Sequence, residues 1–276
     1  MTIRNVIAAM NPNTEARPLL DAALQVAQRF NGNVEALYVT SNPASELMLA
    51  PESLISVDIN HAQLEKIAFE RAALARSRFT AWRAGKPAGE QNAAWSEHEG
   101  LLEAVLERRG RLADLLVLHH PVAGAPDSER AFDAGVFGTG RPCLLVRDTP
   151  VPMLFEHVAI AWNGSLEGAR AVGGAMPILE AARQVSIFNV PQLYDDTKFG
   201  HELARALAGH GIEARILPNS EALATVGGRL LTCAEAEGVT LLVMGAYTHS
   251  RMRQRLLGGV TRHVLAHAAV PILMAH

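Results

Sequence analysis

Three things are scarce in this chain of 276 residues: cysteine, aromatic side chains and a surplus of charge of either sign. Its two cysteines, Cys143 and Cys233, lie far apart in unrelated sequence contexts, so the pattern of a disulfide framework is missing. We expect both thiols to be buried and reduced, Cys143 in a strand and Cys233 in a helix. Reduced thiols are typical of a cytoplasmic protein, which is the location we expect.

The charge balance and the hydropathy pattern argue against two further classes of protein, nucleic-acid binders and membrane proteins. The net charge is −3, from 25 basic and 28 acidic residues, and a dedicated binder of nucleic acid or of an anionic membrane normally has a basic surplus. No uncharged apolar stretch approaches the ~20 residues of a membrane helix. The apolar run near the N-terminus, VIAAM, is too short for the core of a signal peptide. We therefore expect neither a nucleic-acid partner nor a membrane.

The chain repeats itself. Residues 5–11 (NVIAAMN) match residues 157–163 (HVAIAWN), and each copy continues into a helix rich in small residues and then a short second strand. Further along, residues 114–118 match 240–244, and residues 141–146 match 270–274. The sequence therefore predicts two copies of one domain, at 1–149 and 154–276, joined by a linker that its prolines stiffen.

Each copy alternates apolar strands with helical segments, which predicts an α/β fold with a parallel sheet covered on both faces. In the second half we expect strands near 157–162, 184–190, 212–217, 240–245 and 271–275, and helices near 165–182, 195–210, 221–237 and 258–268. The first half follows the same plan, with a weak third strand near 93–96 and an extra loop at 41–60. Its helix at 61–82 should bury Leu64, Ala68, Ala72, Ala75, Phe79 and Trp82.

The stretch from Val243 to Pro271 has the parts of an anion site. An apolar strand runs into Gly245, a loop with three arginines follows, and Gly258 and Gly259 open a helix. The first N–H groups of a helix have no intrahelical partner, and glycine lets a phosphate approach the backbone. A tight turn without a ligand and a solvated arginine loop remain alternative interpretations.

Four segments carry a resemblance to a known family: VAIAWNGS at 158–165, LLVMGAYTHSR at 241–251, LGGVTRH at 257–263 and VPILMAH at 270–276. The chain resembles the universal stress protein family, and more closely its tandem-domain bacterial members. The resemblance implies two Rossmann-like domains, each an open five-stranded parallel sheet of order 3-2-1-4-5 with helices on both faces. It also implies an intrachain pseudo-dimer, leaving further pairing as a homodimer open, and ATP or another adenine nucleotide as the ligand of some members.

The nucleotide motif of those members, Gly-x2-Gly-x9-Gly-Ser/Thr, is only partly kept. Gly245 and Gly258 hold the first and third positions, whereas Thr248 replaces the second glycine and Gly259 replaces the hydroxyl residue. Asn163 stands where an aspartate is usual, and an amide is a weaker partner for a ribose hydroxyl than a carboxylate. The residues that we expect at an adenine nucleotide are Ala161, Asn163, Val190, Gly245, His249, Arg251, Arg253, Gly258, Gly259, Val260 and Thr261.

The first half is the poorer candidate. His119 and His120 replace its first glycine, and the acidic residues Asp127, Glu129 and Asp133 that follow would repel a phosphate. The two adjacent histidines do not indicate a metal site, because neighbours on an extended segment point in opposite directions. Glu97 to Glu99 precede a helix, where acidic side chains complement the helix dipole, so we expect a capping role for them.

No catalytic signature is present. The chain lacks a Gly-x-Ser-x-Gly elbow, a Walker lysine and a His-Glu-x-x-His pair, so we expect no enzyme and no metal ligand set. The favoured function is a regulatory stress-response protein that binds an adenine nucleotide in its second half. The alternative is a nucleotide-independent interaction or protective protein that acts through a dimerisation surface. An enzyme acting on adenylates is the least favoured class, and the protein partner is unknown.

Overall fold

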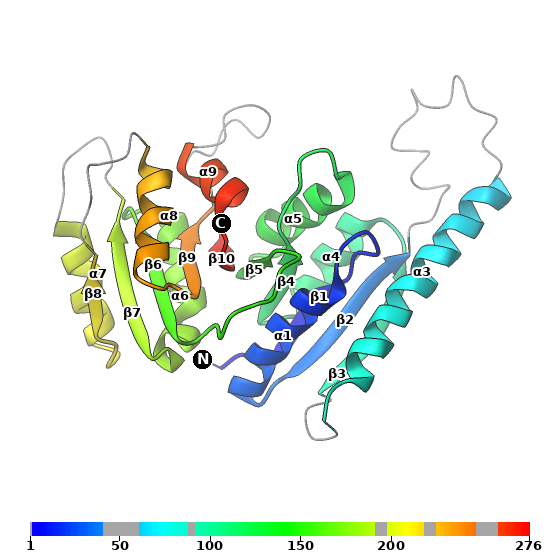
Figure 1. Cartoon of the computed structure of the whole chain (residues 1–276), viewed down its shortest axis with the longest axis horizontal. Helices are drawn as coiled ribbons and strands as arrows, with labels where there is room; N and C mark the ends of the chain where they lie inside the picture. Colours follow the sequence, from blue (N-terminus) through cyan, green and yellow to red (C-terminus); the bar gives the residue numbers. More distant parts are fainter. Residues whose placement is uncertain (1, 41–60, 88–91, 191–197, 218–224, 247–258) are drawn as a thin grey trace. The chain divides into compact units, whose positions relative to one another are not determined.

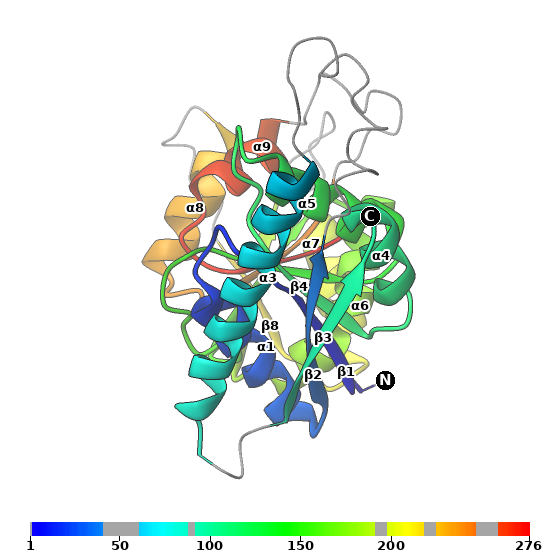
Figure 2. The ribbon, with the colours of Figure 1, turned by 90° about the vertical axis from the view of Figure 1, so that its right-hand side faces the viewer.

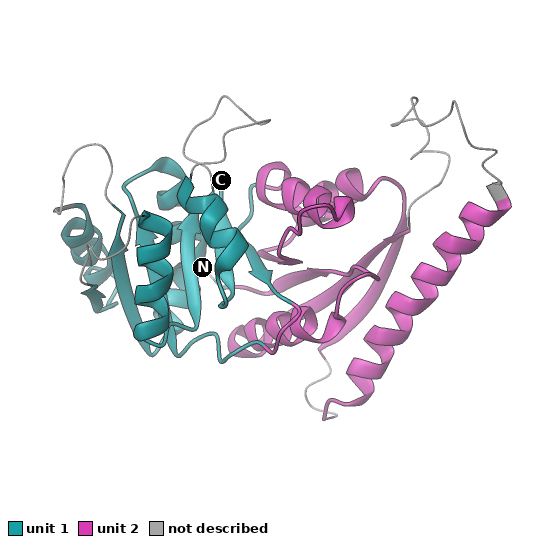
Figure 3. Cartoon of the chain, turned by 45° about the horizontal axis from the view of Figure 1, so that its top comes forward, with its two compact units in different colours: residues 1–2, 140–147, 151–276 teal, residues 3–139, 148–150 magenta. Residues whose placement is uncertain are grey.

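The computed structural model describes residues 2–40, 61–87, 92–190, 198–217, 225–246 and 259–276. The chain forms two compact units (Figure 3), and each is described by itself. Unit 1 consists of Met1–Thr2, Gly140–Arg147 and Val151–His276, and unit 2 consists of Ile3–Thr139 and Asp148–Pro150.

Strands and helices alternate along the described chain (Figure 1). The first half contains β1 (Asn5–Ala9), α1 (Ala16–Phe30), β2 (Asn33–Thr40), α3 (His61–Ala84), β3 (Ala93–Glu99), α4 (Leu102–Gly110), β4 (Leu115–His119), α5 (Pro126–Gly138) and β5 (Cys143–Val146). The second half contains β6 (His157–Trp162), α6 (Leu166–Ala181), β7 (Gln184–Asn189), α7 (Lys198–Ala208), β8 (Ala214–Ile216), α8 (Val226–Ala236), β9 (Leu241–Gly245), α9 (Gly259–His267) and β10 (Ile272–Ala275). These bounds lie within a few residues of most of the predicted ones.

The strands of the second half run in the order β8-β7-β6-β9-β10, and all four neighbouring pairs are parallel. This is the order 3-2-1-4-5 that the resemblance implied. In unit 2 the order is β3-β2-β1-β4, also with parallel pairs. The α/β fold class with an open parallel sheet is confirmed.

Burial explains why the central strands are continuous apolar runs. Leu241, Leu242 and Val243 of β9 have no exposed surface, and the same holds for Leu115 to Val117 of β4. Strands covered by helices on both faces cannot alternate apolar with polar residues, because neither face meets water. In unit 2, α1 and α3 lie on one face of the strands and α4 lies on the other (Figure 2).

Helix α3 buries the face that the sequence predicts. Ala72, Ala75, Phe79 and Trp82 are buried, whereas Leu64 and Ala68 of the same face are half-buried. The ring of Phe79 lies 5.7 Å from that of Trp95 on β3, and Trp95 stacks on Tyr38 of β2 at 5.9 Å. This aromatic cluster fixes α3 against β2 and β3.

Strand β3 corrects two expectations. It is not a weak strand ending near residue 96, because it pairs with β2 over seven residues, from Ala93 to Glu99. The expected capping role of Glu97 to Glu99 is therefore wrong. These residues lie in the strand, where Glu97 accepts a hydrogen bond from Thr40 at 3.0 Å. The N-cap residue of α4 is Leu101, without a side-chain hydrogen bond.

Strand β5 groups with the second half of the chain. It pairs antiparallel with β10, Leu144 opposite Leu273, and both strands are fully buried. The compact units therefore differ from the predicted domains 1–149 and 154–276 at residues 140–147. The physical reason is that backbone pairing of β5 with β10 adds a strand to unit 1. The predicted bounds themselves stay a prediction.

Arg147, directly after β5, strengthens this attachment. Its Nε donates to the carbonyl of Ala268 at 2.6 Å, and its Nη2 donates to the carbonyl of Leu265 at 2.8 Å. The last carbonyls of a helix have no intrahelical donor, and a cation also complements the dipole at that end. Arg147 thus caps the C-terminus of α9.

We predict that Arg147→Ala lowers the stability of unit 1 by about 1–3 kcal/mol, because two charge-assisted hydrogen bonds to carbonyl groups are lost. Urea denaturation of the full chain measures the change. The matched control is Arg183→Ala, which removes an exposed ion pair with Glu156 and should cost less than about 0.5 kcal/mol. Equal effects of the two variants would contradict the capping role.

Candidate functional site

The second half has a switch point between β6 and β9. The chain proceeds from β6 outward to β7 and β8, and then continues on the other side of β6 with β9 and β10. The connections that leave the carboxyl ends of β6 and β9 therefore diverge, and ligands of open α/β sheets bind in the crevice between such connections. Asn163 follows β6 at this point, and Gly245 ends β9.

Asn163 stabilises the turn that leads into α6. Its Oδ1 accepts a hydrogen bond from the backbone N–H of Ser165 at 3.1 Å, and Gly164 between them has a φ of +71°. Ser165 is the N-cap of α6, and its hydroxyl accepts from the N–H of Gly168 at 3.0 Å. In this turn the oxygen of Asn163 already has a structural role.

The first half contains the corresponding hydrogen bond, in a turn with Pro12 in place of the glycine. There, Asn11 Oδ1 accepts from the N–H of Asn13 at 2.9 Å. The two asparagines that end the matching sequences of the repeat therefore share a local hydrogen bond from residue i to residue i+2. This bond explains, without any ligand, why an Asx residue stands at both positions.

Gly245 is required by the packing of β9 against α6. A Cβ at this position would lie 2.5 Å from the backbone nitrogen of Gly168 and 2.7 Å from the carbonyl carbon of Glu167. No real Cβ makes contacts that short, so only glycine fits. Gly245 thus brings the end of β9 against the first turn of α6, which is a structural reason for the first glycine of the motif.

Gly259, in contrast to the tightly packed Gly245, has space beside it. It is the first residue of α9, and a Cβ added there would meet no atom within 4 Å of those that the structure describes. The first turn of α9 contains no acidic residue. Val260 is half-buried, and Thr261 is buried. Among the described residues, nothing fills the space beside Gly259 at the start of α9.

Ala161 and Val190 lie at the carboxyl ends of β6 and β7. Ala161 is buried opposite Phe188, and the N–H of Val190 donates to the carbonyl of Trp162 at 2.7 Å. Among the predicted ligand residues, Ala161, Asn163, Val190, Gly245, Gly259, Val260 and Thr261 are described. His249, Arg251, Arg253 and Gly258 lie outside the described residues, as do Thr248 and Arg255.

The corresponding position in the first half contains a small cavity of about 60 Å³. This is far below the ~300–1,000 Å³ of a typical small-molecule pocket. It lies at the carboxyl ends of β1, β2 and β4 and the start of α5. Its lining residues are Ala9, Met10, Asn11, Pro12, Tyr38, Val39, Arg71, Leu102, Leu118, His119, Asp127, Ser128, Arg130 and Ala131. Sequence reasoning missed Tyr38, Arg71 and Arg130, because no motif marks them.

The start of α5 satisfies its own backbone. The N–H groups of Ser128 and Glu129 donate to the carbonyl of Ala125 at 3.0 and 3.3 Å. The Ser128 hydroxyl accepts from the N–H of Val122 and donates to the same carbonyl. Asp127 and Glu129 add negative charge to the first turn. This helix start is therefore occupied internally.

Two of the charged residues that line the cavity, Arg130 and Asp127, form an ion pair. Arg130 pairs with Asp127 at 3.4 Å and with Glu103 at 3.3 Å. Tyr38 lines the same cavity, and burial raises its pKa to about 12, with a partly compensating effect of Arg71. The Tyr38 hydroxyl therefore remains protonated at neutral pH.

His119 connects the cavity to the linker. The ring is buried, and its Nδ1 lies 3.0 Å from Oδ1 of Asp148, a residue of the linker that belongs to unit 2. The hydrogen bond from His119 holds the pKa of the Asp148 carboxyl below its ordinary value, although burial opposes this effect. His119, which in the sequence stands in place of the first glycine of the motif, thus contacts the linker residue Asp148.

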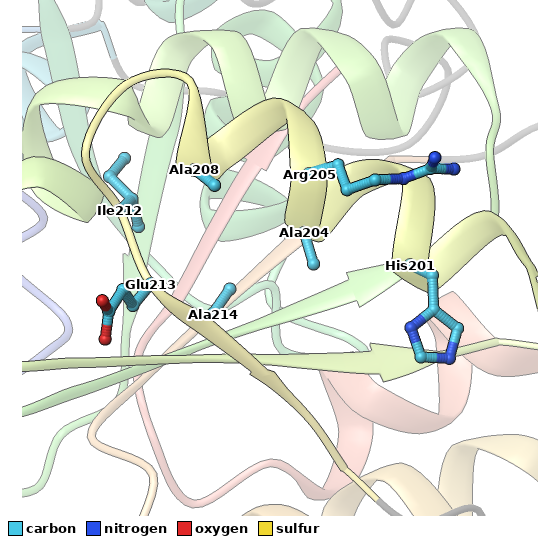
Figure 4. A pocket seen from close by; sticks show the side chains of 7 residues that line it. All are labelled: His201, Ala204, Arg205, Ala208, Ile212, Glu213 and Ala214. Carbon is cyan, nitrogen blue, oxygen red and sulfur yellow. The ribbon is translucent and has the colours of Figure 1, made fainter.

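A larger hollow of about 500 Å³ lies at the outer edge of unit 1, away from both switch points. Figure 4 shows its lining side chains, which come from α7 and from the chain entering β8: His201, Ala204, Arg205, Ala208, Ile212, Glu213 and Ala214. It is a shallow surface depression without converging polar groups, and we assign no site to it.

Two features are absent from the described part of the chain. No group of three or more His, Cys, Asp or Glu side chains could hold a metal ion there. No helix of the described ranges is long and apolar enough to cross a membrane.

Comparison with known proteins supports the resemblance seen in the sequence. Residues 196–276 match the model of the universal stress protein family. Universal stress protein Slr1230 of Synechocystis sp. is 24% identical, and the match covers 98% of this chain and 99% of that protein. The resemblance to this family is therefore confirmed.

Two solved structures share the fold. A universal stress protein of Archaeoglobus fulgidus superposes with a TM-score of 0.72 at 15% identity. The superposition covers 99% of this chain and 96% of the Archaeoglobus chain. A putative universal stress protein of Pseudomonas aeruginosa superposes with a TM-score of 0.58 at 13% identity, covering 99% and 93%. At these identities the likeness concerns the fold.

We predict that Asp148→Asn destabilises the protein slightly, by less than about 1 kcal/mol at pH 7, because the Asp148 side chain is 47% exposed. The pKa of Asp148 is lowered in the folded state, so its contribution is complete above the ordinary pKa near 3.8 and is lost as the pH falls through the lower folded pKa. Urea denaturation of both proteins from pH 7 to pH 3 measures this. A difference that grows toward low pH would contradict the pairing.

Proposed function

We propose that this chain, which resembles the universal stress protein family, is a regulatory protein that binds an adenine nucleotide in its second half. The site is the carboxyl end of the sheet between β6 and β9. A cytoplasmic location and a role in the stress response are part of this proposal.

The observation that carries the proposal is the open backbone at Gly259. This residue begins α9, which follows β9 in the chain, and the space around its Cα is clear of described atoms. The N–H groups of a helix start and the positive end of its dipole favour a phosphate. The arginines at 251 and 253 precede this helix in the sequence and would add positive charge. We therefore place the phosphates at the first turn of α9.

The other end of the ligand would lie over the ends of β6 and β7. The adenine would lie near Ala161 and the half-buried Val190, where β6 and β7 end, and the ribose near Asn163. Because the Oδ1 of Asn163 already accepts from Ser165, it is a weaker acceptor for a ribose hydroxyl than a free carboxylate. We therefore expect the backbone of α9 to supply most of the affinity.

The contrast with the first half supports one nucleotide per chain. At α5 the N–H groups of Ser128 and Glu129 are satisfied by Ala125, and two acidic residues occupy the first turn. At ~4 Å and an effective dielectric near 20, one like-charge contact costs up to about 4 kcal/mol, more than the ~0.3–1 kcal/mol that a helix end contributes. A phosphate would not bind there.

The proposed role is sensing without turnover. An occupied site would change a partner surface, whereas no described group combines a nucleophile with a base at the switch point of the second half. The alternative is a nucleotide-independent interaction protein. Nucleotide that co-purifies with the protein, is released by heating and is identified by its mass would favour sensing. Phosphate release that tracks the protein through purification would favour an enzyme.

We predict that Gly259→Asp lowers the affinity for ATP at least tenfold without lowering stability. The added carboxylate would repel the phosphates, yet it has room and complements the dipole of α9. Calorimetric titration measures affinity, and thermal unfolding measures stability.

The matched control is Gly259→Ala, which adds the Cβ without the charge and should change ATP affinity by less than about threefold, since the space is open. If Gly259→Asp binds ATP as the unaltered protein does, the phosphates do not lie at the start of α9 and the proposed placement fails.

We also predict that ATP, ADP or AMP binds with a stoichiometry of at most one per chain. The reason is the occupied helix start of α5 and the small cavity beside it. Titration calorimetry on the full chain gives the number of sites. Two equivalent sites per chain would contradict the difference between the halves.

A further inference from the structure

Helix α9 carries two histidines about one helical turn apart. His263 and His267 are separated by four positions, so their side chains lie on the same side of the helix. Their rings stack with 4.4 Å between the centroids and 26° between the planes. His263 is half-buried, and His267 is exposed. Two histidines at this spacing on one face of a helix can bind one transition-metal ion together.

A hydrogen bond fixes which nitrogen of His267 is available to a metal. Its Nδ1 lies 2.9 Å from the backbone carbonyl of His263, and a carbonyl only accepts hydrogen bonds, so Nδ1 carries the proton. In the neutral ring Nε2 then has a free lone pair. Metal-binding histidines typically donate their second N–H to a carbonyl or carboxylate, because this bond orients the ring. His267 is therefore oriented to bind through Nε2.

The packing of α8 against α9 holds the other ring. Gly227 of α8 lies so close to His263 that an added Cβ would be 2.9 Å from both Cβ and Cδ2 of the histidine. Real Cβ atoms do not make such contacts, so the glycine leaves just the room that the imidazole needs. His263 is thus positioned by the fold, whereas the exposed His267 can adjust its ring.

The separation of the two rings suits a single ion. An imidazole nitrogen binds a metal such as zinc at about 2.0–2.1 Å, so two nitrogens on one ion lie at most about 4 Å apart. With the ring centroids at 4.4 Å, a small tilt of the His267 ring brings its Nε2 within this distance of a nitrogen of His263.

We propose that His263 and His267 bind a divalent transition-metal ion, with water in the remaining coordination positions. Within the described residues no third His, Cys, Asp or Glu side chain joins the pair. Imidazole ligands favour Cu²⁺, Ni²⁺ and Zn²⁺ over Mg²⁺ and Ca²⁺, which take oxygen ligands, and Cu²⁺ binds most tightly of these. The pair lies beyond the first turn of α9 and is separate from the proposed nucleotide site.

The surroundings set the expected strength of binding. Two protein ligands hold an ion less firmly than the three or four of a catalytic or structural zinc site. Arg147, whose guanidinium binds the carbonyls of Leu265 and Ala268, adds positive charge at the same end of α9. We therefore expect a dissociation constant for Cu²⁺ in the micromolar range.

Cu²⁺ is the probe, and electron paramagnetic resonance of the full chain is the readout. The chain has 11 histidines, so the ion is added at less than one equivalent, and without nucleotide, which would chelate it. Pulsed measurements count the imidazoles on the ion, and we expect two. Calorimetric titration under the same conditions gives the affinity, which an excess of Mg²⁺ should leave unchanged.

Two single variants test the ligands. His267→Ala should lower the affinity for Cu²⁺ at least tenfold and remove the signal of two imidazoles, and His263→Ala should do the same. The matched control is His210→Ala, which removes an exposed histidine after α7 and should change neither readout. Thermal unfolding checks that each variant folds. Because His263 packs against α8 and its removal can disturb the fold, the exposed His267 gives the deciding variant.

Two results would overturn the proposal. The first is a bound Cu²⁺ with fewer than two imidazoles in the unaltered protein. The second is unchanged Cu²⁺ affinity in His267→Ala. ATP titration without added metal reports separately on the first turn of α9, so failure of the metal site is distinguishable from failure of the nucleotide site.

Discussion

The parallel ladder between β6 and β9 is the constraint on which the second half depends. Val158 to Ala161 of β6 lie in register with Leu241 to Met244 of β9, and these residues are buried. Because the chain reaches β9 only after building β7 and β8 on the other side of β6, this pairing creates the switch point. Both elements of the candidate site, the turn after β6 and the connection after β9, start from its carboxyl end.

Two glycines near this ladder act in different ways. Gly245 is packed so tightly against the first turn of α6 that no side chain fits, whereas Gly259 stands in open space at the start of α9. In the nucleotide motif Gly245 holds a glycine position, whereas Gly259 stands in place of the hydroxyl residue. The structure assigns to Gly245 the packing of strand on helix, whereas no described atom crowds Gly259.

The two halves have diverged at the same place in the fold. Where β9 ends in Gly245, β4 ends in His119, whose ring is buried and paired with Asp148. The helix start that follows is closed by Ala125 and by acidic residues at α5. In the second half α9 begins at a glycine that no described atom crowds, while the first half has a small cavity whose wall includes His119. Strand β5 completes the sheet of unit 1.

Sequence alone determined the two-fold repeat, the order of elements and the inward face of α3, because apolar periodicity follows directly from which face meets the core. It also located Asn163, Gly245 and Gly259 at strand and helix ends. It misjudged β3, since the charged residues Glu97 and Glu99 obscure a strand whose pairing with β2 is set by distant residues. Only the tertiary structure joined Arg147 to α9 and His119 to Asp148. These contacts link residues 29 to 121 positions apart, and no local pattern records such a distance.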